Sequence, residues 1–102
     1  MNNFEKIIGK WKHVAPWDSD DYLAVYEIFG TEVRPVVAGK DLNDNEEFII
    51  SNVQWVNGTL IFTSFMPSTK RSGLNKFWLS ESGSLTSEFT FTVVEELVRE
   101  ST

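Results

Sequence analysis

The chain has 102 residues, of which 41% are hydrophobic, 14% are aromatic and none is cysteine, and its formal net charge is −6. This length fits a single domain over residues 1–102, and the lack of cysteine excludes disulfides, thiol catalysis and cysteine-ligated zinc. With one histidine and no cysteine, the chain is expected to bind no metal and no cofactor. Its acidic charge argues against a nucleic acid as partner, and the lack of an apolar run of ~20 residues argues against a membrane. The N-terminus lacks the apolar region of a secretory signal, so we expect a cytoplasmic protein, or a mature chain without its targeting segment.

The first predicted element is a short helical turn that ends at Gly9. At helical spacing its apolar residues share one face: Phe4, Ile7 and Ile8. Glycine ends many helices because it adopts left-handed backbone angles without strain. A short strand is expected over 11–14, followed by a loop over 16–21.

Two predicted strands, 22–29 and 32–38, flank the dipeptide Gly30-Thr31. Glycine at the first central position suits a two-residue type II′ turn. Such a turn sets Ile28 opposite Val33, so that apolar side chains meet on one face and charged side chains on the other. The pattern therefore predicts a tight hairpin over 22–38.

A second hairpin is predicted where Asn57-Gly58 separates the strands 48–56 and 59–66. Asn-Gly favours a type I′ turn, in which both central residues have positive φ. Two-residue closure pairs Trp55 with Leu60. The face that this register turns inward is mainly apolar: Ile49, Ser51, Val53 and Trp55, with Leu60, Phe62, Ser64 and Met66.

The last two predicted strands are 73–80 and 85–94. Alternation in the second strand sends five residues inward: Leu85, Ser87, Phe89, Phe91 and Val93. The register between the strands stays open. A three-residue loop would turn Phe77 and Leu79 inward, whereas a loop of two or four residues would turn Trp78 inward.

These elements predict an all-β fold: a small antiparallel up-and-down barrel, or a strongly curved sheet, of about seven or eight strands with a short N-terminal helical turn. Gly9-Lys10-Trp11 resembles the G-x-W opening of the lipocalins and the wider calycin group, including the avidins. The resemblance implies that Trp11 closes one end of a barrel and that an arginine near the last strand packs across its ring. Arg99 is the candidate for that arginine. The chain is shorter than a lipocalin and lacks the T-D-Y-like turn of that family.

The resemblance also implies a small apolar or amphipathic ligand in an aromatic cup. The residues predicted to bind it lie on the expected inward faces: Ser51, Trp55, Phe62, Ser64 and Phe91. The alternative is a non-enzymatic protein-interaction module with a filled core. That module would self-associate, as a homodimer, through the strand of Pro35, because proline cannot donate a ladder hydrogen bond and favours an edge. For an enzyme, the chain offers dispersed carboxylates and one histidine, His13, so no catalytic residue is assigned.

Two polar loops invite other interpretations. Asp41, Asn43 and Asn45 match the first ligand positions of a calcium loop, but Glu46 stands where the turn needs glycine, so a solvated loop is expected. The segment 67–71 brings two hydroxyls and two cations together. It lacks the glycine-rich setting of a phosphate loop and is expected to be a basic surface loop.

Overall fold

The computed structural model describes residues 4–13, 24–42, 45–92 and 96–100. A 3-10 helix, η1 (Phe4–Ile7), opens the chain, and seven strands follow: β1 (Gly9–Lys12), β2 (Ala24–Gly30), β3 (Pro35–Asp41), β4 (Ile49–Val56), β5 (Thr59–Met66), β6 (Arg71–Leu79) and β7 (Leu85–Thr92). The predicted helical turn before Gly9 is therefore confirmed as a short 3-10 helix. The predicted loop over 16–21 lies outside the described residues.

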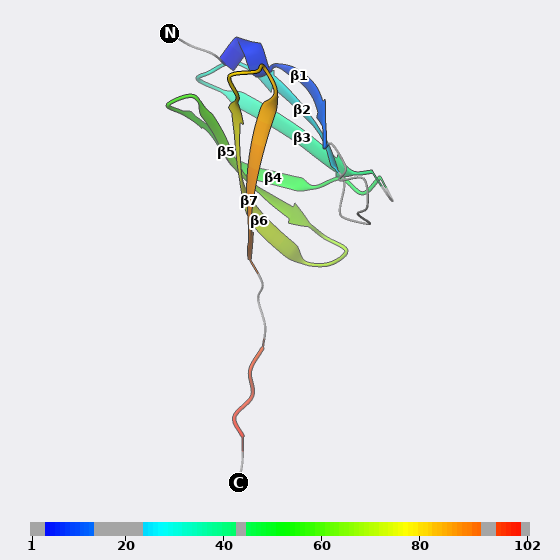
Figure 1. The fold of residues 1–102 in the computed structure, drawn as a ribbon. Coiled ribbons are helices and arrows are strands. Elements are labelled where there is room, and N and C mark those ends of the chain that lie inside the picture. Colours follow the sequence, from blue (N-terminus) through cyan, green and yellow to red (C-terminus); the bar gives the residue numbers. More distant parts are fainter. Residues whose placement is uncertain (1–3, 14–23, 43–44, 93–95, 101–102) are drawn as a thin grey trace.

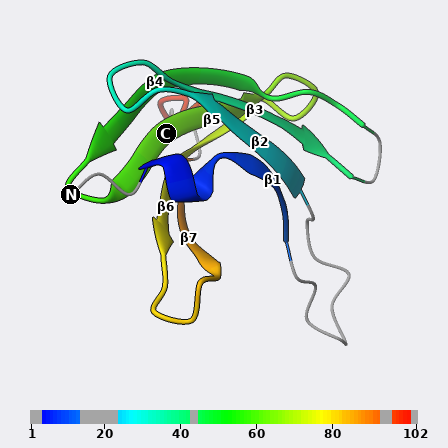
Figure 2. The same ribbon diagram turned by 90° about the horizontal axis from the view of Figure 1, so that it is seen from above.

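The strands form two antiparallel sheets, one in the order β1-β2-β3 and one in the order β4-β5-β6-β7. A bridge between Lys40 and Glu47, and a hydrogen bond of 2.9 Å from the Phe48 amide to the Gly39 carbonyl, join β3 to the start of the second sheet. Figures 1 and 2 show that the strands are strongly curved. The outer strands are β1 and β3 in the first sheet and β4 and β7 in the second. The prediction of an antiparallel all-β fold with a strongly curved sheet is confirmed.

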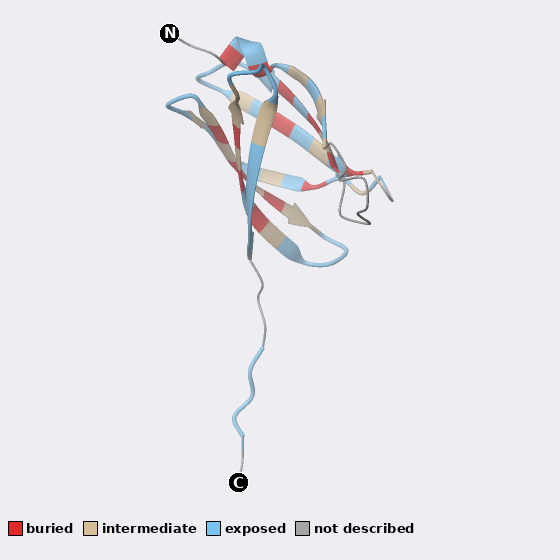
Figure 3. Ribbon diagram, in the orientation of Figure 1, coloured by how far each residue is buried: buried red, intermediate tan, exposed pale blue. Residues whose placement is uncertain are grey.

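The core lies between the two sheets, as the buried segments in Figure 3 indicate. Its centre is a group of three rings, Tyr26, Phe62 and Phe77, whose centroids lie 5.0–5.7 Å apart in edge-to-face arrangements. Edge-to-face pairs place the positive edge of one ring on the negative face of another, so they stabilise beyond the area they bury. Phe4 and Ile7 of η1 are fully buried and cover one end of this core, whereas Ile8 is exposed.

The predicted register of the first hairpin is wrong. Ile28 pairs with Val37 rather than Val33, and Gly30 pairs with Pro35. The turn lies at residues 31–34, where the Thr31 amide donates to the Arg34 carbonyl and the Thr31 hydroxyl accepts from the Arg34 amide. A side-chain hydroxyl thus supplies an acceptor at the turn, which a search for Gly-containing turns does not anticipate. Pro35 opens β3, one of the two outer strands of its sheet, as expected.

The second hairpin confirms its predicted turn. Trp55 pairs with Leu60, and Asn57 and Gly58 have φ angles of 49° and 80°, as a type I′ turn requires. A β-bulge between Ser51 and Gln54, with Asn52 at φ 54°, then shifts the register by one residue. Because side chains alternate along a strand, the shift exchanges the two faces of the first half of β4.

The expectation that Ile49 and Ser51 face inward is therefore wrong. Both are exposed, and Ile50 packs against the core in their place.

The open register between β6 and β7 is settled by a short loop. The Ser80 amide donates to the Ser84 carbonyl at 2.8 Å, and Gly83 between them has a φ of 89°. This is the three-residue alternative, and it turns Phe77 into the core with 3% of its surface exposed.

Candidate functional site

The predicted ligand-binding residues do not converge on a central cup. Trp55 packs edge-on against Phe4, with ring centroids 5.4 Å apart, and Phe62 is enclosed by Tyr26 and Phe77. Ser51 is exposed on the other side of the bulge. Trp55 and Phe62 thus pack against other rings of the core, as side chains commonly do in the interior of small β-structures.

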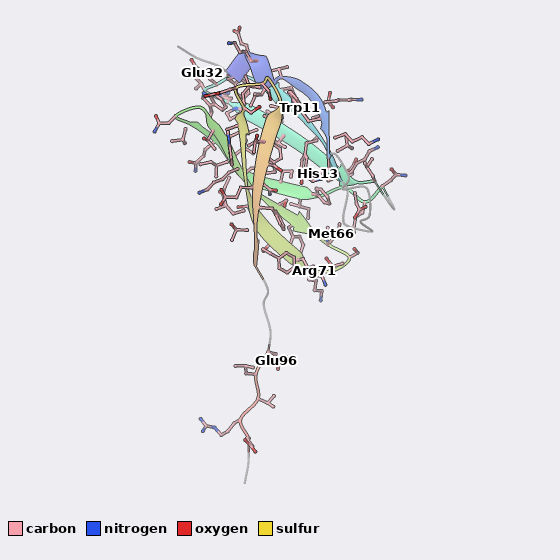
Figure 4. The ribbon with its side chains drawn as sticks, in the orientation of Figure 1. Trp11, His13, Glu32, Met66, Arg71 and Glu96 are labelled. Atoms are coloured by element: carbon pink, nitrogen blue, oxygen red, sulfur yellow. The ribbon has the colours of Figure 1, made fainter. Side chains whose placement is uncertain are left out.

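The other two predicted residues, Ser64 and Phe91, line one groove on the inner side of β5, β6 and β7. The groove has a volume of about 260 Å³, and we call it the aromatic groove. Its lining residues are mostly apolar: Phe48, Ser64, Met66, Arg71, Ser72, Phe89 and Phe91. Figure 4 shows Met66 and Arg71 at the end of the sheet from which the C-terminal segment leaves.

The rings of Phe89 and Phe91 form the open wall of the aromatic groove. Their centroids lie 6.0 Å apart, and the two residues keep 50% and 45% of their surface exposed. The strict alternation of β7 places both rings on one face, where they line the aromatic groove, but neither ring is buried and Ser87 of the same predicted inward face is also exposed. It does not predict their exposure, because β7 pairs with β6 on one edge and no described strand pairs with its other edge.

One cation lies in this apolar setting. The Arg71 guanidinium carbon is 5.4 Å from the centroid of the Phe91 ring, within the range of a cation–π contact. Arg71 is exposed, so its donors can also reach a bound anion. An exposed cation beside two half-exposed rings suits a molecule with an apolar body and an acidic end.

Ser64, which lines the aromatic groove, belongs to a buried polar pair. The Asn75 side-chain amide donates to the Ser64 hydroxyl at 2.9 Å, and both residues are buried. A hydroxyl can donate while it accepts, so Ser64 can offer its proton to a ligand. The sequence predicts Ser64 as an inward-facing residue but does not identify Asn75. Alternation along β6 would have placed Asn75 on the same face as Phe77 once the register of that strand was known.

Gly73 lies next to the aromatic groove. It pairs with Phe91 in the register, and the Phe89 ring lies over it so closely that a β-carbon would be 2.2 Å from the ring. A larger residue at 73 would therefore displace the Phe89 wall. The sequence shows this glycine at the start of the predicted strand 73–80 but gives no reason for it.

A second, wider groove of about 670 Å³ lies where β2 and β3 approach β4. Tyr26, Val37, Phe48 and Ile50 contribute to its lining, and charged side chains surround them: Lys10, Glu27, Lys40 and Glu47. Opposite charges thus mix along its border. This groove is more open than the aromatic groove, and its charges favour no single sign of ligand.

The residues that carry the resemblance to lipocalins have separate places. Gly9 links η1 to β1 with a φ of 138°, and the Trp11 indole donates to the Ile7 carbonyl at 2.7 Å. Trp11 therefore fastens η1 to the sheet while it packs against the core. Arg99 is exposed in the C-terminal segment, which leads away from the sheets in Figure 1, so the structure does not place it across the Trp11 ring.

The polar loops have local explanations. In the segment 67–71, the Ser68 amide and hydroxyl both donate to the Glu46 carboxylate, at 3.0 and 2.5 Å. The anion that this loop binds is therefore a side chain of the same protein. Residues 43 and 44 of the calcium-like loop lie outside the described residues. Among the residues that the structure describes, no group of three or more potential metal ligands occurs.

His13 takes part in the backbone pairing next to β2. Its Nδ1 accepts a hydrogen bond of 3.1 Å from the Ala24 amide, and burial lowers the pKa of its imidazole. An accepting Nδ1 is unprotonated, so both observations favour the neutral ring. This explains His13 as part of the structure.

Within the described ranges, no helix has the length and apolar character needed to cross a membrane. Comparison with models of known families, with curated proteins and with solved structures finds no significant match.

Proposed function

We propose that this chain is a small, lipocalin-like cytoplasmic protein that binds a small amphipathic molecule with an acidic end group, and that the aromatic groove is the binding site. The observation that carries the proposal is Arg71 beside the half-exposed rings of Phe89 and Phe91. Few soluble proteins leave neighbouring rings uncovered without a partner for them. Arg71 adds a preference for an anion at one end.

The dimensions of the aromatic groove limit the ligand. Its volume of about 260 Å³ is below the ~300–1,000 Å³ of pockets that hold drug-sized molecules. A medium-chain carboxylate or a small aromatic acid fits that limit. The apolar body would lie along Phe89 and Phe91, and the carboxylate would meet Arg71 and the Ser64 hydroxyl.

Titration of the isotope-labelled protein with octanoate, followed by NMR of the backbone amides, tests this proposal. We expect the amide signals of Ser64, Ser72 and Phe91 to move together. Octan-1-ol and octylammonium, which keep the chain and change the end group, are the control ligands and should bind more weakly. No saturable shift up to the solubility limit of octanoate, or shifts confined to the second groove, would show the proposal to be wrong.

Two matched variants separate the acidic end from the apolar body. An exposed ion pair contributes ~0.5–1 kcal/mol, so Arg71→Gln should weaken octanoate binding about two- to fivefold and leave octan-1-ol binding unchanged. Lys76→Gln removes a cation from the other face of β6 and should change neither. Phe91→Ala should weaken both ligands.

The alternative function, protein interaction, has one specific observation in its favour. The free edge of β7 runs beside the exposed rings, whereas β3, the strand of Pro35, is paired with β2 and joined to the second sheet by the Lys40–Glu47 bridge. Self-association is therefore better sought at β7.

A further inference from the structure

The C-terminal segment 96–100 has the sequence Glu-Leu-Val-Arg-Glu and leaves two apolar side chains uncovered. Leu97 and Val98 are 89% and 84% exposed. Figure 1 shows this part of the chain leading away from both sheets, and Figure 4 places Glu96 well beyond the last strand. The segment and the aromatic groove are thus two apolar surfaces of the same chain, and both are exposed among the residues that the structure describes.

Charge decides which face of the segment suits the groove. In an extended chain, alternate side chains share a face, so Glu96, Val98 and Glu100 point one way and Leu97 and Arg99 the other. The cation of the groove is Arg71, and Lys70 precedes it. The face with one valine between two glutamates complements an apolar groove with a basic border. The face with Arg99 would bring like charges together.

The chain's own geometry favours a second copy as the source of the segment. In Figure 1, residues 96–100 lead away from both sheets of their own copy, so this segment would have to turn back to reach its own groove. A second copy needs no such turn, and a two-fold axis would let each copy place its segment in the groove of the other.

We propose that the protein forms a homodimer in which residues 96–100 of each copy dock in the aromatic groove of the other. Val98 inserts beside Phe89 and Phe91, and Glu96 and Glu100 lie toward Arg71 and Lys70. The outer edge of β7, with which no described strand pairs, is available to the backbone of the incoming segment, as in β-strand addition. The inference uses the groove of the proposed function, so octanoate and the segment should compete for it.

Analytical ultracentrifugation of the full chain over a concentration series, without added ligand, tests the dimer. We expect a concentration-dependent monomer–dimer equilibrium. Val98→Asp would put a carboxylate against the rings and should weaken dimerisation at least about tenfold. Leu97→Asp changes the neighbouring, equally exposed residue on the other face and is the matched control, which should dimerise as the parent does. A strictly monomeric parent, or equal effects of the two variants, would overturn the inference.

Charge reversal gives an independent check. Arg71→Glu should also weaken dimerisation, and combining it with Glu96→Arg and Glu100→Arg should restore it. Failure of the combined variant to recover would contradict the proposed pairing. Octanoate titration of the Val98→Asp variant, at a concentration at which ultracentrifugation shows it to be monomeric, keeps the two proposals apart, because it measures the ligand where the segment does not compete. A dimer with no octanoate binding would support the inference and reject the proposed function, and the opposite result would do the reverse.

Discussion

Gly39 should accept a side chain only at a cost in stability, because the Tyr26 ring lies against it. A β-carbon built at Gly39 would be 2.7 Å from Tyr26 Cδ1 and 3.1 Å from Phe48 Cδ2. Both rings are buried, and Tyr26 is held by the edge-to-face contacts with Phe62 and Phe77. In Gly39→Ala the ring cannot move without disturbing the centre of the core.

The expected loss of stability follows from two opposing contributions. Forcing extra volume into a well-packed core costs about 1–3 kcal/mol. Replacing glycine by alanine restricts the unfolded chain and returns about 0.4–1 kcal/mol. We therefore expect Gly39→Ala to lower the free energy of unfolding by about 1–2 kcal/mol, which for a domain of this size is a fall of roughly 4–16 °C in Tm.

Gly73→Ala is the matched control, because its β-carbon would be even closer to a ring. It would lie 2.2 Å from Phe89 Cε1, but that ring is half-exposed and can swing toward solvent. The Thr90 carbonyl at 3.0 Å leaves a small residual cost. We expect a loss below about 0.5–1 kcal/mol after the gain from the unfolded state.

Urea unfolding at 25 °C, followed by far-ultraviolet circular dichroism, measures both variants. If Gly73→Ala lost as much stability as Gly39→Ala, the reasoning that ring mobility decides the cost would be refuted.

Three further predictions concern the core, the bulge and the imidazole. Phe62→Ala should lower the free energy of unfolding, measured with urea, by about 3–5 kcal/mol. Phe91→Ala removes a half-exposed ring and should lower it much less. Similar losses in the two variants would contradict the assigned core. Asn52→Ala should lower the free energy of unfolding by about 1–2 kcal/mol, because the positive φ of the bulge is unfavourable for alanine. Asn52→Gly should cause no such loss, because glycine adopts positive φ without strain. Equal effects of the two variants would argue against the bulge. Burial lowers the pKa of His13, so the folded state binds fewer protons than the unfolded state, and the free energy of unfolding should fall as the pH drops below about 6.5. His13→Gln should remove that part of the pH dependence, and an unchanged profile would show that another group causes it.

The predictable part of the fold is the part that backbone rules decide locally. Asn57-Gly58 fixes its turn through positive φ, and the strict alternation of β7 fixes the direction of Phe89 and Phe91. The register at 30–35 was not predictable in this way, because the Thr31 hydroxyl takes part in the turn. A side chain that competes for backbone hydrogen bonds moves a turn without changing the apolar pattern.

The candidate site was half predictable for a similar reason. Ser64 follows from the register that the Asn57-Gly58 turn sets and Phe91 from alternation along β7, and both line the aromatic groove. Ser51 failed because the bulge at Asn52 lies between it and the turn that set its register. Asparagine tolerates positive φ, so Asn52 was a signal for such a bulge, but many asparagines in strands have no such role. The sequence predicts Arg71 in a basic surface loop. Its position over the Phe91 ring could not be predicted without the pairing of β6 with β7.

The aromatic groove sets an upper limit on how tightly either proposed occupant can bind. Complete burial of a phenylalanine side chain contributes about 1.5–3 kcal/mol, so covering the exposed halves of Phe89 and Phe91 contributes about 1.5–3 kcal/mol in total. An exposed ion pair at Arg71 adds at most ~1 kcal/mol. Association of two molecules costs more than these contributions together, about 4 kcal/mol or more, so either occupant needs further contacts. The incoming segment can find them as backbone hydrogen bonds along the edge of β7, whereas a small carboxylate can find them only in the burial of its own apolar chain, which contributes about 0.8 kcal/mol per methylene group. If both proposals hold, the dimer should therefore be the tighter complex, and octanoate should bind Val98→Asp more strongly than it binds the parent.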